Sequence, residues 1–272
     1  MKLRGIFVAL VTYHLSLLAV LPAEPTAKGI QDNSFLVEEA YNQEPGVVQH
    51  IINVPVFFTG SSHEITPSFT QEWPFFSQTH QLSYTVPYVF TDSDNGFADI
   101  RLNYRLQALM ESERVPAFAP RFSLVLPAGD SNKGFGVGGV GYEWNLPFSK
   151  IVSDRWTLHF NAGMSIFPNV HGHDLLNYNL GASGIYAVCR DFNLMLETVA
   201  GWNQDVDVAR RVESSTSVLI SPGARYAINR PGDLQIVLGA AVPVGLTSDS
   251  PDWGMFFYLS FEHPFLRMPK GD

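Results

Sequence analysis

The 272-residue sequence has few charged residues and a single cysteine. Charged residues make up 16% of the chain, below the roughly 25% of an ordinary soluble domain, which disfavours a typical cytosolic enzyme. Lys and Arg number 17 against 26 Asp and Glu and form no cluster. Because phosphate binding needs a basic field, nucleic acid is not expected as a partner. Cys189 alone cannot form an internal disulfide.

Long apolar runs are also missing after the first residues. Lys2 and Arg4 precede an apolar stretch at 5–20, and small residues follow at Ala23 and Ala27. This order predicts a cleaved signal peptide over residues 1–27 and therefore export. The alternative is an uncleaved anchor, but the stretch is shorter than the ~20 residues of a membrane span and contains polar residues. Further along, no run approaches the ~18 residues that would predict a transmembrane helix.

The sequence contains many long segments in which apolar and polar residues alternate. In residues 97–108, polar residues occupy one face and apolar residues the other, and residues 156–166 repeat the pattern. A helix would scatter these polar residues around its axis, whereas a strand puts them on one side. About twelve such segments of about 10 to 14 residues are found. They begin near Val47, Ile65, Thr79, Phe97, Ala117, Gly134, Arg155, Leu176, Phe192, Ser215, Asp233 and Trp253.

Strands of this length with this alternation are typical of membrane barrels. We therefore predict an all-β fold, a transmembrane antiparallel up-and-down β-barrel of about 12 strands, over residues 47–266, with a tail at 267–272. A soluble sandwich or lipocalin-like barrel is the alternative. It is disfavoured because the face opposite the apolar one is rich in Gly, Ser, Asn and Thr rather than in Lys and Glu.

The connections and tryptophans suggest the orientation of the barrel. Short turns alternate with longer polar loops, as expected for periplasmic turns and outward loops. Two connections on the short side, 110–116 and 148–154, are longer than this rule allows. Tryptophans are expected near the two membrane interfaces. The strand assignment puts three at the periplasmic end and two at the outer end: Trp73, Trp144 and Trp156, then Trp202 and Trp253.

The region around residues 99–139 resembles a known family. Asp99, Ile100 and Leu102 are followed by an LPAG strand end at 126–129, and then by a Gly-rich stretch at 134–139. These motifs are similar to those of the meta-pathway phenol-degradation family of Gram-negative outer-membrane barrels, over roughly residues 65–265. The resemblance implies a porin-like transporter of small hydrophobic or aromatic compounds. It implies outer-membrane lipid, small-molecule solutes and the outer-membrane assembly machinery as partners. Family barrels often end on a Phe, whereas Phe265 here is followed by further residues.

The residues before the first strand, 28–46, are expected to form a periplasmic N-terminal segment. Within Asp32–His50, the spacing of Phe35 and Tyr41, with Asn33 or Ser34 as a cap, predicts a short helix that ends before Pro45. It could enter the barrel mouth as a plug or dock a partner. A surface helix beneath the barrel is the favoured interpretation.

Inward-facing charged and polar residues are the main candidates for function. We expect a narrow charged lumen that passes small molecules, with a basic ladder of Arg101, Arg105 and Arg121 facing Asp99, Glu143 and Glu197. A closed structural or interaction barrel without transport is the alternative. The residues expected to line the lumen and set its selectivity are Asp99, Arg101, Asn103, Arg105, Arg121, Glu143, His159, Glu197, Arg225 and Glu262.

Other chemical motifs are weak. A G-x-G-x-x-G run at 134–139 precedes a strand-like stretch, not the helix that a dinucleotide site requires, so no cofactor is expected. His171, His173 and Asp174 could share a metal ion, although solvated loop residues are favoured. A lipid-modifying enzyme would need a Ser-His pair facing the bilayer, whereas His159 is expected to face the lumen. The chain is therefore not expected to be an enzyme.

Overall fold

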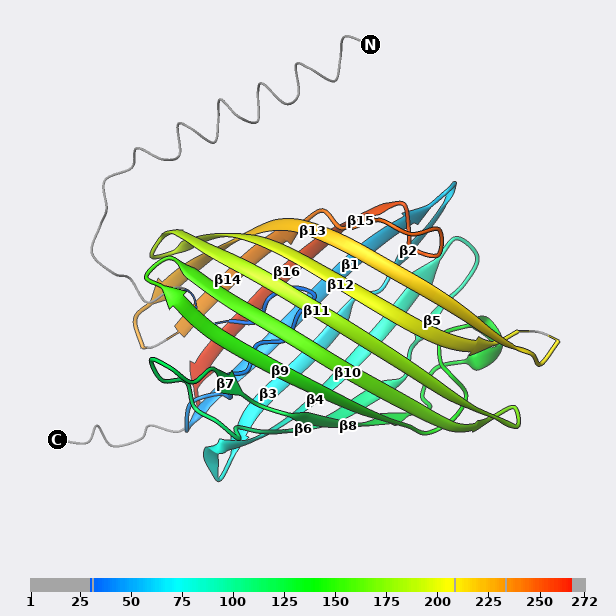
Figure 1. Ribbon diagram of the computed structural model, residues 1–272, viewed down its shortest axis with the longest axis horizontal. Helices are drawn as coiled ribbons and strands as arrows, with labels where there is room; N and C mark the ends of the chain where they lie inside the picture. Colours follow the sequence, from blue (N-terminus) through cyan, green and yellow to red (C-terminus); the bar gives the residue numbers. More distant parts are fainter. Residues whose placement is uncertain (1–29, 31, 208, 233, 266–272) are drawn as a thin grey trace, which may run out of the picture.

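The computed structural model describes residues 30, 32–207, 209–232 and 234–265. Its strands form one sheet of sixteen segments that closes on itself. Closure comes from β1 and β16, which pair antiparallel from Val47 opposite Pro264 to Phe58 opposite Trp253. The result is a tilted, elongated barrel (Figure 1). The predicted signal peptide at 1–27 and tail at 267–272 lie outside the described residues.

The sixteen segments make twelve antiparallel spans, because four pairs of successive segments continue one another: β2 with β3, β5 with β6, β7 with β8, and β14 with β15. The bounds are β1 Val47–Thr59, β2 Ser62–Ile65, β3 Ser68–Phe75, β4 Ser77–Thr91, β5 Asn95–Phe97, β6 Ile100–Leu106, β7 Ala117–Phe118, β8 Arg121–Leu126, β9 Gly141–Ser153, β10 Trp156–Val170, β11 His173–Cys189, β12 Phe192–Val206, β13 Val212–Arg230, β14 Leu234–Ala241, β15 Val244–Gly245 and β16 Trp253–Pro264. The predicted all-β barrel of about twelve strands is confirmed.

Proline accounts for three of the four interrupted spans. Pro67, Pro120 and Pro243 lie in the breaks that follow β2, β7 and β14. Proline has no N–H to donate to the sheet, so each of these positions lacks one hydrogen bond of the ladder. The proline carbonyls still accept from Tyr88, Leu106 and Gly254 on neighbouring strands. The barrel wall therefore stays closed across these breaks.

The two faces of the wall differ as the alternation predicts. On β12, Glu197 is 1% exposed and faces inward, whereas its neighbour Leu196 is 53% exposed on the outer surface. The same contrast holds on β10 for His159 and Phe160. An apolar exterior around a polar interior is the architecture of bacterial outer-membrane barrels. Within the described residues, no helix has the length and apolar character to cross a membrane.

Three local predictions are wrong. Phe148–Ser153 belongs to β9, so the connection there is a tight turn at Asp154 and Arg155. The Gly-rich residues 134–139 lie in the loop between β8 and β9, after a short 3-10 helix at Ser131–Lys133. Gly134 and Gly138 have φ values of 75° and 81° there, a left-handed conformation that glycine adopts without a steric penalty. Since β9 begins only at Gly141, Trp144 is its fourth residue and lies nearer the loop end than the periplasmic end at which it was expected.

A charge on the outer wall should destabilise the barrel. Leu102 is 46% exposed in the middle of β6, between Tyr84 on β4 and Leu124 on β8. We expect Leu102→Arg to lower the free energy of unfolding in a lipid bilayer by about 2–4 kcal/mol, because the guanidinium would face hydrocarbon. Urea unfolding in liposomes measures this. Leu102→Phe is the control, and equal stabilities of the two variants would contradict an outward-facing Leu102.

Candidate functional site

The barrel interior holds the described residues that precede the first strand, 30 and 32–46. Residues 30–46 run as a coil inside the end of the barrel where β1 begins and β16 ends (Figure 1). We call Ile30–Gly46 the inner segment. Its described residues contain no helix, so the predicted short helix is wrong, as is its favoured position on the surface. The spacing of Phe35 and Tyr41 imitates a helical face, but these side chains contact different walls of the lumen.

Apolar contacts anchor the first half of the inner segment. Phe35 stacks on Phe256 with ring centroids 5.5 Å apart and lies 5.2 Å from the ring of Tyr258. It belongs to a buried cluster with Ile51 of β1 and Met195 of β12. A Cβ at Gly239 would collide with the Phe35 ring, so the missing side chain makes the space that this ring fills.

Barrel side chains bind the backbone of the inner segment. The carboxylate of Glu197 accepts hydrogen bonds from the N–H groups of Phe35, Leu36 and Val37 at 3.2, 2.9 and 3.1 Å. Arg225 donates to the carbonyls of Ile30, Asp32 and Asn33 at 2.7, 2.6 and 2.8 Å. A buried coil needs such partners because it has no regular ladder of its own. These two predicted lumen residues therefore hold the segment.

The amides of the wall continue this pattern along the segment. Asn161 accepts from the Glu38 N–H and donates to the Glu38 carbonyl, at 2.8 and 2.7 Å. Gln107 does the same for Asn42 N–H and the Ala40 carbonyl, at 2.9 and 2.8 Å. An amide can serve both groups at once because it carries an acceptor and two donors.

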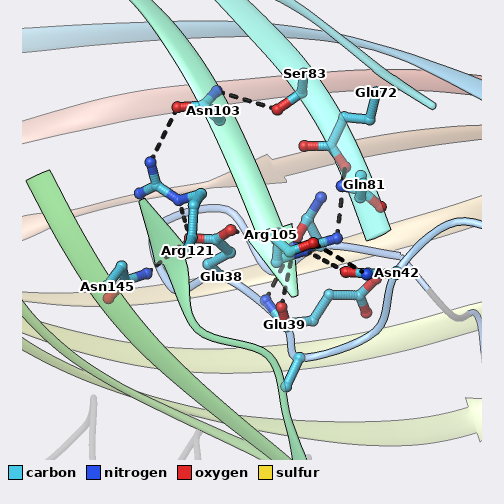
Figure 2. Close-up of polar contacts among 12 residues, drawn as sticks. Glu38, Glu39, Asn42, Glu72, Gln81, Ser83, Asn103, Arg105, Arg121 and Asn145 are labelled. Atoms are coloured by element: carbon cyan, nitrogen blue, oxygen red, sulfur yellow. Dashed lines mark hydrogen bonds and ion pairs between the residues drawn. The ribbon is translucent and has the colours of Figure 1, made fainter. Parts of the chain in front are cut away.

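An ion cluster lies between the inner segment and strands β3 to β9 (Figure 2). Glu38 pairs with Arg105 at 3.1 Å and with Arg121 at 2.8 Å. Arg105 is 2% exposed and also donates to Asn42 Oδ1 and the Tyr41 carbonyl, at 2.8 and 2.7 Å. Its guanidinium lies 3.7 Å from Glu72. A buried charge must be paired in this way, because leaving it alone is costly.

Of the three arginines in the predicted basic ladder, one lies beside a carboxylate that was predicted to face it. Arg101 pairs with Glu143 at 3.1 Å, but Arg105 and Arg121 turn to Glu38 of the inner segment. Asp99 instead accepts from the N–H groups of Gly129 and Val137 at 3.0 and 2.8 Å. These bonds hold the β8–β9 loop at the end of the barrel opposite the inner segment.

The remaining predicted lumen residues have the following places. Asn103 is buried and donates to Ser83 Oγ at 3.0 Å. His159 is 1% exposed, and its Nδ1 lies 2.7 Å from Ser149 Oγ. Glu262 of β16 lies opposite Gln49 of β1 and is half-buried. Their proposed part in selectivity stays a prediction.

The structure does not bring His171, His173 and Asp174 together around a common point, in keeping with the favoured interpretation of solvated loop residues. Their side chains are used otherwise: His173 Nε2 lies 3.0 Å from the Arg210 carbonyl, and Asp174 accepts from the Asn169 N–H at 2.9 Å. In the part of the chain that the structure describes, no group of three His, Cys, Asp or Glu side chains is arranged to hold a metal ion.

Sequence reasoning missed the residues that pair with the predicted ones. Glu38, Asn42 and Asp32 belong to the inner segment, and Glu72 to β3. Asp32 accepts from Gln49, Tyr258 and Ser260 at 2.7, 2.6 and 2.6 Å. Inward-facing residues on β3 could have been read from its alternation. A coil has no such periodicity, so no pattern in the sequence indicates which residues of the inner segment contact the wall.

Known proteins place the chain in a family. The family model described as "Putative MetA-pathway of phenol degradation" matches residues 38–262. The chain belongs to this family. No curated protein matches it.

Solved structures resemble the barrel. The COG4313 outer membrane channel from Pseudomonas putida F1 is 10% identical, with a TM-score of 0.63 over 82% of this chain and 97% of that one. The NanC porin, also 10% identical, gives a TM-score of 0.49 over 78% of this chain and 98% of that one. At these identities the likeness concerns the fold alone.

The pKa values of two adjacent carboxyl groups on the inner segment, those of Glu38 and Glu39, are shifted in opposite directions. Burial acts to raise the pKa of Glu38, but Arg121 and Arg105 outweigh it and hold that pKa below the ordinary value. Burial, together with the nearby charge of Asp32, raises the pKa of Glu39 to about 8. Glu39 is therefore a group whose ionisation opposes the bound position of the segment.

The bound segment should loosen as pH rises. A raised pKa means that the bound state is favoured below the ordinary pKa of Glu39, near 4.5, and loses stability as pH rises through about 8. We expect Glu39→Gln to slow hydrogen exchange of the segment amides by about tenfold or more at pH 8 and to have little effect at pH 4.5.

Hydrogen exchange of the full chain between pH 4 and 9 measures this effect. Glu44→Gln, at an exposed position of the same segment, is the matched control. A Glu39→Gln effect that is the same at every pH would contradict the ionisation of Glu39 as its cause.

Proposed function

We propose that the protein is an outer-membrane channel for small molecules whose lumen is restricted at one end by the inner segment. The observation that supports it most is a polar interior that is not filled completely. A cavity of about 420 Å³ lies between the inner segment and residues such as Asn53, Thr85 and Arg101. A second, of about 600 Å³, lies toward the loop end, beside Phe57 of β1 and Ser217 of β13.

These cavities are stacked along the strands. On β1, Asn53 lines the first cavity and Phe57 the second, four residues further along the same inward face. A solute entering from the loop end would therefore meet the wider cavity first. Beyond the deeper one, the inner segment fills the lumen, so passage requires this segment to shift.

The segment is held by hydrogen bonds to the wall that can be exchanged for hydrogen bonds to water. Its polar bonds to the wall replace bonds to water. Each neutral bond contributes only about 0.5–1.5 kcal/mol net, and each bond to a charged group such as Glu197 or Arg225 about 1.5–3 kcal/mol. Its coil conformation lets it rearrange without breaking a helix or strand. A local shift of such a segment costs less than opening the barrel, whose strands are paired around the circumference.

A closed structural barrel is the second candidate. The pairing of the buried Arg105 with the partly buried Glu38 at the centre of the ion cluster favours it, because moving the segment would leave these charges without partners. That the protein is not an enzyme stays a prediction. The hydrophobic or aromatic substrate that the family resemblance implies also stays a prediction. Ser149, the hydroxyl nearest His159, accepts from the Ala40 N–H at 2.7 Å, which supports a structural role for it.

Locking the inner segment should close the channel. Ser34 Oγ and Ser183 Oγ lie 2.9 Å apart and join the segment to β11. We expect Ser34→Cys with Ser183→Cys, in a Cys189→Ser background, to conduct only after reduction. Single-channel recording in planar bilayers before and after a reductant measures this.

The two single-cysteine variants are the controls, and they should conduct equally under both conditions. Equal, non-zero conductance of the oxidised and reduced double variant would show that the segment is not the barrier. Absence of conductance in every form, the natural chain included, would favour the closed structural barrel.

A further inference from the structure

The deeper cavity is lined by an unusual density of amide side chains. Five asparagines from five different strands face it, and we call it the amide cavity: Asn53, Asn103, Asn145, Asn161 and Asn179. The hydroxyls of Thr70, Ser83 and Thr85 add to this lining. Its volume of about 420 Å³ lies within the range of small-molecule sites.

Two of these amides have an acceptor without a hydrogen-bond partner among the described residues. Asn145 is 7% exposed, and its Nδ2 donates to Glu38 Oε2 and Asn161 Oδ1 at 2.7 and 3.2 Å. These two acceptors fix the orientation of the amide. Its Oδ1 is buried without a hydrogen-bond partner among the described residues, as is Oδ1 of Asn53. A buried acceptor without a donor is costly, so a ligand hydroxyl that reaches either oxygen after a small shift of its amide would form a favourable hydrogen bond.

Donors face the same cavity. Arg101 is bound through Nε to Glu143, and no hydrogen bond of its two terminal nitrogens to a described residue is found. Arg121 donates through Nε to Glu38 and through one terminal nitrogen to Asn103 and Ser123. Guanidinium groups have five N–H donors, so each retains capacity for an acceptor.

The charges around the cavity cancel. Arg101 and Arg121 line it together with Glu38 and Glu72, and both arginines already have a carboxylate partner. A charged ligand would have to compete with these ion pairs. An uncharged ligand that carries many groups able both to donate and to accept matches the lining better, and the hydroxyl is such a group.

We propose that the amide cavity binds a small uncharged polyol of about the size of a monosaccharide. Its hydroxyls would donate to Asn53 and Asn145 and accept from Arg101 and Arg121. The outer cavity also offers hydroxyls on the way in, from Thr59, Ser62, Thr91, Ser217, Ser248 and Ser250, beside the carboxylates of Glu64, Asp92 and Asp249, which disfavour an anionic ligand. This site names a substrate class for the proposed channel and rests on that function for its physiological meaning.

Saturation-transfer NMR of the full chain, refolded in a detergent without a sugar headgroup, tests the site with D-glucose. Glucuronate, glucosamine and benzoate probe the two charged classes and the aromatic class. We expect saturable binding of glucose that exceeds that of all three. Asn53→Leu should weaken it by about 3- to 10-fold, because one hydrogen bond is lost. Among the described residues, no hydrogen bond of the Asn53 side chain would be broken by this change.

Asn203→Leu is the matched control, since Asn203 lies on β12 outside both cavities and its replacement should leave glucose binding unchanged. No saturable glucose signal, or preferred binding of benzoate or of a charged analogue, would overturn the proposal. So would equal affinity of Asn53→Leu and the natural chain. Binding does not require passage: a barrel that binds glucose but does not conduct refutes the channel alone, and one that conducts without binding refutes the site alone.

Discussion

The hydrogen bonding of a coil inside a barrel governs the rest of this structure. An irregular backbone buried away from water needs a partner for each N–H and carbonyl group. The inner segment obtains them from side chains of the wall, above all Glu197 and Arg225, which bind three backbone groups each. In a wide aqueous channel, the polar side chains of the wall would face water. Here they bind the inner segment instead.

The same constraint explains the position of the charges. Glu38 of the segment gathers Arg105 and Arg121, whereas Arg101, beyond the segment, pairs within the wall to Glu143. The lumen is therefore divided along its axis. At the terminal end, charges are paired with the segment and buried. Toward the loop end, polar groups face cavities.

In the channel that we propose, this division would make the lumen selective by its shape and by its hydrogen bonds. A plain barrel of about twelve strands would have an interior wider than a packed core. Here Phe35 and the ion cluster fill one end, and the loop held by Asp99 lies over the other. Between them remains a space lined by amides, hydroxyls and paired charges. In the proposed channel, such a lining would distinguish solutes by their donors and acceptors more than by net charge.

The sequence by itself determined the barrel, because side chains that alternate between lipid and lumen have a period of two along every strand. That period gave the strands and the inward phase of Arg105, His159 and Glu197. It gave no account of the coil at residues 30–46, whose apolar residues imitated a helix. Only the tertiary structure decided that Glu38 meets Arg105 and Arg121, since a coil has no register and its contacts come from strands far away in the chain. Alternation reveals which way a side chain points, and the closed barrel decides what it meets there.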